Sequence, residues 1–128
     1  MSQVIIAKFG GSTIGVDGIS IPIIIQRINS ISKDTKVVAV FSAPLTVIEG
    51  KRTSLTDVVL ELGNRAQDGK SSDLIILRKT YEKILELVSS EFQDECRKII
   101  DDCLDKVQIE LEKAMEKRNF PTKSVLKL

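Results

Sequence analysis

The chain has 128 residues, of which 42% are hydrophobic and 29% are charged, as in an ordinary soluble globular protein. Its net charge of +1 and aromatic content of 4% disfavour nucleic acid and anionic membranes as partners, because these need a positive surface and, for bases, aromatic platforms. The first residues lack the basic start and long apolar run of a signal peptide, and no apolar stretch approaches the roughly 20 residues that span a bilayer. We therefore expect a cytoplasmic protein with no membrane association.

The first third of the chain predicts a strand, a helix and a second strand. Val4–Ala7 is a short apolar run followed by glycines, which indicates a buried strand that ends in a tight turn. Ser20 is a plausible helix cap, with Pro22 in the first turn. Five isoleucines at helical spacing then predict a face that packs on a sheet: Ile21, Ile24, Ile25, Ile28 and Ile31. The β-branched run 36–41 predicts a second buried strand, parallel to the first in a βαβ unit.

The rest of the chain predicts a loop and then helices. The loop covers residues 44–53, and Ser54 with Asp57 resembles a capping box that starts a helix. A polar stretch flanked by Gly63 and Gly69 is expected to end this helix. Ser72 is the expected cap of the next helix. Two apolar stripes then predict a helical hairpin that extends to about Lys117: Leu74, Leu77, Tyr81, Ile84, Leu85 and Val88, followed by Phe92, Cys96, Ile99, Cys103, Val107, Leu111 and Ala114. The fold class is therefore α/β.

The two cysteines of this hairpin are Cys96 and Cys103, which lie seven residues apart on one helical face. That spacing keeps their backbones too far apart for an intrachain disulfide. The chain has no histidine, so a zinc site would need its four ligands from two thiols and carboxylates. We expect no metal site and interpret both cysteines as buried, apolar-like side chains, with metal or redox chemistry as the alternative.

Lys8 and the glycines after the first strand have the properties of a phosphate-binding loop. Phosphoryl transfer needs positive charge and backbone N–H groups beside oxygens that carry negative charge. Lys8 supplies a flexible cation at the carboxyl end of a predicted parallel strand, where α/β sheets place their ligands. Gly10 and Gly11 let the backbone approach phosphates, and Ser12 and Thr13 add hydroxyl groups. The alternative is a simple turn with an exposed lysine, because a lysine before the glycines is not the Walker-A order.

The segment from Ile5 to Thr13 closely resembles the opening of aspartate kinases, members of the amino acid kinase family. It reads I-I-A-K-F-G-G-S-T, and the family has K-F-G-G-T-S, with the last two residues interchanged. Val40-Phe41-Ser42-Ala43 is similar to the family's V-V-S-A segment, and Thr56-Asp57 is similar to its T-(N/D)-x-L helix start. The resemblance implies a partial three-layer fold of the amino-acid-kinase type, with a short parallel sheet, a βαβ start and a helical hairpin.

By this resemblance, the reaction is the ATP-dependent phosphorylation of the β-carboxylate of L-aspartate, on the path to lysine, threonine and methionine. Lys8 would be the catalytic residue that contacts the nucleotide phosphates. The implied nucleotide- or phosphate-binding residues are Lys8, Phe9, Gly10, Gly11, Ser12 and Thr13. Ser42 and Thr56 would bind the amino acid, although the loop between them is longer than in the family, which leaves Thr46 and Thr53 as alternatives to Thr56. The implied cofactors are ATP and Mg²⁺, with the metal bound mainly by residues outside this chain, and we expect a homo-oligomer.

Further motifs of the family do not occur in this sequence. They are the F-G-E segment with a substrate-binding carboxylate, the G-R-G-G-S-D segment, the adenine-binding region and the regulatory domains. Two predicted strands are also few for a finished α/β sheet. We therefore interpret residues 1–128 as the N-terminal portion of an amino acid kinase catalytic domain, inactive alone. The alternatives are a non-catalytic module that self-associates through its hairpin or sheet edge, and a relative that phosphorylates acetylglutamate, glutamate, carbamate or UMP.

Overall fold

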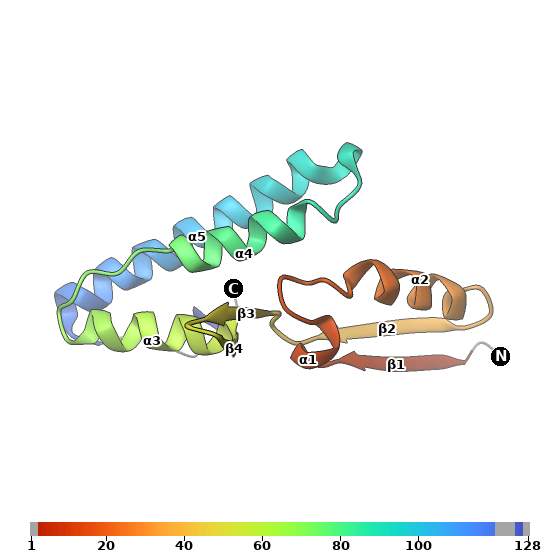
Figure 1. The fold of residues 1–128 in the computed structure, drawn as a ribbon, viewed down its shortest axis with the longest axis horizontal. Helices are drawn as coiled ribbons and strands as arrows, with labels where there is room; N and C mark the ends of the chain where they lie inside the picture. The colour runs from red at the N-terminus through yellow and green to blue at the C-terminus, as the bar shows by residue number, and fades with distance from the viewer. Residues whose placement is uncertain (1–2, 120–124, 127–128) are drawn as a thin grey trace. The chain divides into compact units, whose positions relative to one another are not determined.

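A computed structural model describes residues 3–119 and 125–126 of the chain. The protein is mixed α/β, as predicted, and divides into two compact units, the first ending at Ser54 and the second beginning at Leu55 (Figure 1). The first unit contains β1 (Val4–Phe9), α1 (Gly11–Ile14), α2 (Ile21–Ser32), β2 (Lys36–Phe41), β3 (Leu45–Ile48) and β4 (Lys51–Ser54). The second unit contains α3 (Leu55–Gln67), α4 (Ile75–Leu85) and α5 (Ser90–Lys117). None of the helices in the described ranges is long and apolar enough to cross a membrane.

The predicted βαβ start is confirmed. β1 and β2 pair in parallel, with Val4 opposite Lys36 at one end and Phe9 opposite Phe41 at the other. The rings of Phe9 and Phe41 stack with centroids 5.2 Å apart and an interplanar angle of 22°. The carboxyl ends of the two strands therefore lie side by side, which is the condition for a shared site at this edge.

The helix α2 covers one face of this sheet and contacts β2. Ile24 is buried and Ile21, Ile28 and Ile31 are half-buried, as predicted, but Ile25 is 49% exposed and does not belong to the packed face. Ser20 occupies the N-cap position with Pro22 in the first turn, as predicted, but its side chain forms no capping hydrogen bond.

The opposite face of the β1–β2 sheet is exposed. Because side chains alternate along a strand, this face carries Lys8 and Lys36 together with four apolar residues. These are 45–73% exposed: Val4, Ile6, Val38 and Val40.

The segment predicted as a loop is a β-hairpin, and the prediction is wrong here. β3 and β4 are antiparallel, from Leu45 opposite Ser54 to Ile48 opposite Lys51. Glu49 and Gly50 connect them with φ angles of 50° and 75°. Two turn residues with positive φ match the type I′ geometry that fits the twist of a two-residue hairpin.

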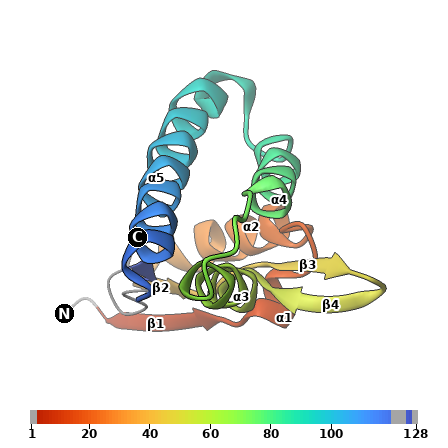
Figure 2. The ribbon, with the colours of Figure 1, turned by 90° about the vertical axis from the view of Figure 1, so that its left-hand side faces the viewer.

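The second unit is built around α5, which contacts both α3 and α4. α4 and α5 run antiparallel as the predicted hairpin (Figure 2). The buried apolar side chains of α3, α4 with its N-cap residue, and α5 are Leu55, Val58, Ala66, Leu74, Leu77, Leu85, Leu104, Val107, Leu111 and Ala114. Two residues of the predicted α5 stripe are instead exposed, Phe92 at 51% and Ile99 at 58%, and the buried Leu104 was not predicted.

The helix α3 ends at Gln67, inside the polar stretch between Gly63 and Gly69, as predicted, whereas the start of α4 differs from the prediction. Gly63 is buried inside α3, at the helical spacing of Leu55, Val58 and Ala66. Its small size suits a position on the packed face, and packing outweighs the low helix propensity of glycine. Ser72 does not cap α4, which begins at Ile75; the Asp73 carboxylate accepts the Ile75 N–H at 3.2 Å.

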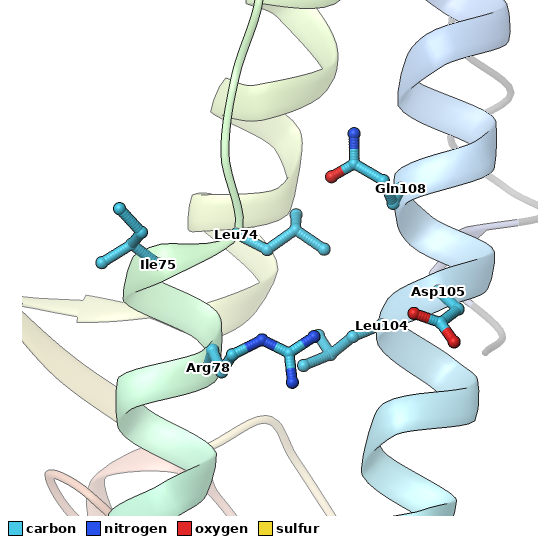
Figure 3. Close-up of a pocket in the computed structure, with 6 residues that line it drawn as sticks. All are labelled: Leu74, Ile75, Arg78, Leu104, Asp105 and Gln108. Carbon is cyan, nitrogen blue, oxygen red and sulfur yellow. The ribbon is translucent and has the colours of Figure 1, made fainter.

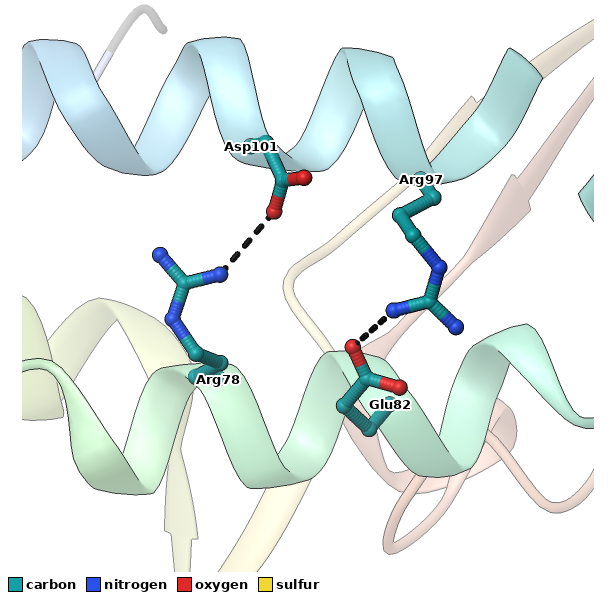
Figure 4. Close-up of polar contacts among 4 residues, drawn as sticks. All are labelled: Arg78, Glu82, Arg97 and Asp101. Carbon is teal, nitrogen blue, oxygen red and sulfur yellow. Dashed lines mark hydrogen bonds and ion pairs between the residues drawn. The ribbon is translucent and has the colours of Figure 1, made fainter. Parts of the chain in front are cut away.

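Two ion pairs link α4 to α5 on one side of the hairpin (Figure 4). Arg78 Nη1 lies 2.9 Å from Asp101 Oδ1, and Arg97 pairs with Glu82. Each helix contributes one arginine and one carboxylate to these pairs. A shift of α5 along α4 that brought Arg97 opposite Arg78 would therefore place two positive charges together. The hydrogen bond that Arg97 donates to the Glu82 carboxylate raises the pKa of Arg97 above its ordinary value.

The cysteines are free, as the disulfide argument predicts. Cys96 and Cys103 are half-buried rather than fully buried. Cys103 lies close enough to Tyr81 to influence its ionisation: burial, and secondly the charge of Cys103, raise the pKa of the Tyr81 phenol.

Candidate functional site

Lys8 lies near the carboxyl end of β1, on the exposed face of the sheet and level with Val40. Its side chain is exposed. It forms no ion pair or hydrogen bond with the part of the chain that the structure describes, so its ammonium group is available to an anion. The residue thus has the position predicted for it, at the ligand edge of a parallel sheet.

The chain after Lys8 presents backbone N–H groups at the same edge. Gly10 has extended φ and ψ angles of −74° and 167°, and its carbonyl accepts the N–H groups of Thr13 and Ile14 at 3.1 and 3.0 Å. The N–H groups of Gly11 and Ser12 find no acceptor within residues 3–119 and 125–126. They are the unpaired donors that the first turn of a helix leaves over. A lysine and two free N–H groups are a donor set suited to an anionic oxygen.

Gly11 is required at its position by close packing. A Cβ atom there would lie 3.0 Å from the carbonyl oxygen of Ala43 and 3.3 Å from Cδ2 of Leu45. Both neighbours belong to the connection from β2 into β3. The absence of a side chain at Gly11 therefore lets the loop approach this connection without displacing it.

Residues 15–17, which follow the glycine loop (residues 8–13), are fixed to β3 by backbone hydrogen bonds. Asp17 donates its N–H to the carbonyl of Leu45 at 2.8 Å, and Leu45 donates to the carbonyl of Gly15 at 3.3 Å. Val16 and Leu45 form a parallel bridge. Gly15 has φ of 84°, a left-handed conformation that favours glycine. The sequence prediction missed this support because it treated residues 44–53 as a loop.

Ser42 lies at the same edge as the glycine loop. It follows β2 directly, and its N–H donates to the carbonyl of Phe9 at 2.9 Å. Its side chain is exposed, as are those of Ser12 and Thr13. The structure thus brings Ser42 together with the segment from Lys8 to Thr13, which the resemblance groups into one site.

The predicted threonine and its two alternatives have different environments. Thr56 is half-buried in the first turn of α3, in the second unit. Thr46 is buried in β3 and 7% exposed. Thr53 is half-buried in β4, and its hydroxyl donates to the carbonyl of Lys51 at 3.3 Å. Of the three, Thr46 is the least accessible to a ligand.

A separate hollow of about 240 Å³ lies in the second unit between the start of α4 and α5 (Figure 3). Its lining residues are Leu74, Ile75, Arg78, Leu104, Asp105 and Gln108. It contains none of the predicted site residues, and its Arg78 is already paired with Asp101. Within the described ranges, no group of three or more acidic, cysteine or histidine side chains is arranged to hold a metal ion.

Comparisons with known proteins add no further assignment: no family model, no curated protein and no solved structure matches the chain.

Proposed function

We propose that this chain supplies the phosphate-binding part of an aspartate-kinase-like active site, in which ATP phosphorylates the β-carboxylate of L-aspartate. The observation that supports it is the placement of Lys8, of the free N–H groups of Gly11 and Ser12, and of Ser42 at the carboxyl ends of two paired parallel strands. The second support is the resemblance of the segment Ile5–Thr13 to the opening of that family.

The chemistry suits these residues. A carboxylate is already a nucleophile, so the reaction needs no general base, and a chain without histidine can contribute to it. Lys8 would neutralise charge on the transferred phosphoryl group, and the N–H groups of Gly11 and Ser12 would bind its oxygens. Positioning and charge neutralisation supply most of the rate in such reactions.

Magnesium would offset further charge on the nucleotide phosphates. The segment from Lys8 to Thr13 contains no carboxylate, so it offers a magnesium ion only hydroxyl and carbonyl oxygens. In this proposal the ion is bound mainly by the nucleotide and by residues other than those of the glycine loop.

Turnover would also require groups that this sequence does not contain. The carboxylate of an F-G-E segment and the G-R-G-G-S-D segment are both absent from residues 1–128. We therefore expect these residues to bind phosphates without catalysing the reaction. Aspartate is the favoured acceptor because the K-F-G-G form with Phe9 resembles the aspartate branch, and acetylglutamate, glutamate, carbamate and UMP are the alternatives.

The exposed sheet face offers a matched pair of lysines for the test. Lys8 and Lys36 share this face, but Lys36 lies at its opposite end, level with Val4. Calorimetric titration of the chain with ATP and with inorganic tripolyphosphate should show binding that Lys8→Ala weakens about tenfold or more, since it removes a charge-assisted contact. Lys36→Ala removes the same charge and should change the affinity less than about twofold. Equal losses in both variants would mean diffuse attraction to a positive face, and the proposed site would be wrong.

The expected lack of turnover is tested separately. A hydroxylamine trap for acyl phosphates, applied with ATP and each of the candidate acceptors, should give no product with residues 1–128 alone. Product formation from aspartate would confirm the substrate and contradict the expected incompleteness.

A further inference from the structure

The long helix α5 has an exposed stripe outside the faces that pack within the second unit. Leu104, Val107 and Leu111 are buried, and the charged side of the helix reaches α4 through Arg97 and Asp101 (Figure 4). Another set of positions along α5 is spaced at intervals of three or four residues, so its side chains share one face of the helix. This set, called here the outer stripe, is exposed throughout: Glu91, Glu95, Lys98, Asp102, Lys106, Ile109, Lys113 and Lys117.

The charges of the outer stripe are segregated along the helix. Its first half contains three acidic residues, Glu91, Glu95 and Asp102, with Lys98 as the one base. Its second half contains three lysines and no acid. Four carboxylates lie beside this half, the exposed Asp105, Glu112 and Glu116 and the half-buried Glu110, and Glu110 Oε1 lies 3.5 Å from the ammonium group of Lys113.

An antiparallel copy of the same helix would complement this pattern. With a two-fold axis at the level of Leu104, Glu91 comes level with Lys117, Glu95 with Lys113, and Asp102 with Lys106. Lys98 then lies level with Glu110. Two-fold symmetry produces each of these pairs twice. A parallel copy in register would place every charge beside its own like.

The same axis also aligns exposed apolar side chains. Ile99, next to the stripe, comes level with Ile109, and the two are 58% and 49% exposed. Neither isoleucine is accounted for by packing within the second unit. An antiparallel contact would bury both pairs at the centre of the charged array.

The helix macrodipole provides a simpler explanation for part of this pattern, because it favours acids near the N-terminus and bases near the C-terminus. That effect is confined to the first and last turns. Glu95, Asp102 and Lys106 lie in the interior of a 28-residue helix, where the dipole gives no reason for their signs.

We propose that the outer stripe of α5 binds the outer stripe of a second copy of this chain, in antiparallel orientation about an axis near Leu104. The contact is dominated by exposed charge pairs, each of which contributes little, and it contains few apolar side chains. The dimer is therefore weak and dissociates as the ionic strength rises. The proposal is independent of the phosphate site in the first unit.

Charge reversal at Glu95 and Lys113 tests the proposal, because these residues cannot interact within one chain. They are 18 positions apart on one helix, about 27 Å at 1.5 Å per residue. Sedimentation of the full chain at several concentrations and at low salt should show a monomer–dimer equilibrium. Glu95→Lys and Lys113→Glu should each weaken the dimer about tenfold, since each converts two attractive pairs into two repulsive ones. The double variant Glu95→Lys with Lys113→Glu should return to within about threefold of the original affinity.

A mixture of the two single variants gives a second, independent readout. The heterodimer of the Glu95→Lys chain with the Lys113→Glu chain has both pairs complementary, whereas each homodimer has both pairs repulsive. Mixing should therefore restore the dimer affinity that each variant alone has lost. Asp34→Lys, in the connection from α2 to β2, is the control: it makes the same change in net charge as Glu95→Lys at an exposed position outside α5.

Circular dichroism of each variant confirms that the helices are retained. A strictly monomeric chain at low salt would overturn the proposal. So would a dimer that is insensitive to salt, a double variant as weak as the single ones, or an equal loss with Asp34→Lys.

Discussion

Gly11 lies so close to Ala43 that a Cβ atom on the glycine would stand 3.0 Å from the alanine carbonyl oxygen. The neighbour is backbone, held in place by the hydrogen bonds that join Leu45 to Gly15 and Asp17. It cannot move aside as a flexible side chain would. A side chain at position 11 would therefore force the glycine loop and the start of β3 apart by a few tenths of an ångström.

We predict that Gly11→Ala destabilises the first unit by about 1–3 kcal/mol, the usual cost of overpacking. The same change should weaken ATP binding, because the loop must shift to relieve the contact. Urea unfolding followed by circular dichroism measures the first effect and calorimetry the second. Gly10→Ala is the control: its φ is −74° and nothing lies within 4 Å of its added Cβ atom, so its effect should stay below about 0.5 kcal/mol. Similar losses in both variants would argue against the packing explanation.

The turn of the β-hairpin contains a residue that is poorly suited to its conformation. Glu49 has φ of 50°, which costs a residue with a side chain about 1–2 kcal/mol, and asparagine tolerates it better. Glu49→Asn should therefore stabilise the first unit by about 0.5–1 kcal/mol. Gly50→Ala, at φ of 75°, should destabilise it by about 1 kcal/mol. Thermal unfolding of the two variants should shift in opposite directions, and a shift in the same direction would show that this turn does not limit stability.

Leu111 and Met115 both lie on α5, but Leu111 is buried and Met115 is exposed. Leu111 is 3% exposed, and Leu111→Ala should lower the free energy of unfolding of the second unit by about 2–5 kcal/mol through the cavity that it creates. Met115 is 38% exposed, and Met115→Ala removes a side chain of similar size. Its cost should remain below about 1 kcal/mol. Chemical unfolding, followed by the helical signal, distinguishes the two.

Tyr81 is the single tyrosine of a chain without tryptophan, so its ionisation can be followed directly by near-ultraviolet absorbance. Burial, and secondly Cys103, raise the pKa of its phenol above the ordinary value of about 10. The folded chain thus holds the phenolic proton more tightly than the unfolded chain does. The resulting stabilisation is complete below pH 10 and is lost as the pH rises through the folded-state pKa.

Cys103→Ser removes the smaller of these two causes. We expect it to lower the pKa of Tyr81 part of the way toward the ordinary value while burial keeps it raised. Absorbance titration of the native chain, the variant and the urea-unfolded chain provides the three values. An unchanged pKa in the variant would show that the Cys103 thiol does not act on the phenol.

Elements with strong periodicity were predicted well. β1 and β2 are short β-branched runs next to clear turn residues, and their parallel pairing follows from the helix between them. The length of α5 was predicted because its apolar residues repeat over about six turns. Its packed face was less certain, since Ile99 and Leu104 both lie near the edge of the stripe, and neighbouring helices decide which of them is buried.

The β3–β4 hairpin and the start of α4 were not predictable by the same means. β3 and β4 have four residues each, too few to show an alternation, and Glu49 is an unusual first residue for a type I′ turn. Gly63 continues a helix because of packing with residues distant in sequence. At the site, the proximity of Ser42 to Lys8 follows from two parallel strands that share an edge, whereas the support of the glycine loop by Leu45 depends on the hairpin and had no visible signal.

The exposed face of the β1–β2 sheet has a consequence for the strength of anion binding. Lys8 stands on this face beside Ile6 and Val40, both largely open to water. Water around the ammonium group weakens its attraction for a phosphate, because the local dielectric constant is high. Any apolar layer that covers Val4, Ile6, Val38 and Val40 would displace this water and strengthen the attraction. Covering the sheet and binding the anion are then cooperative, and each raises the affinity of the other.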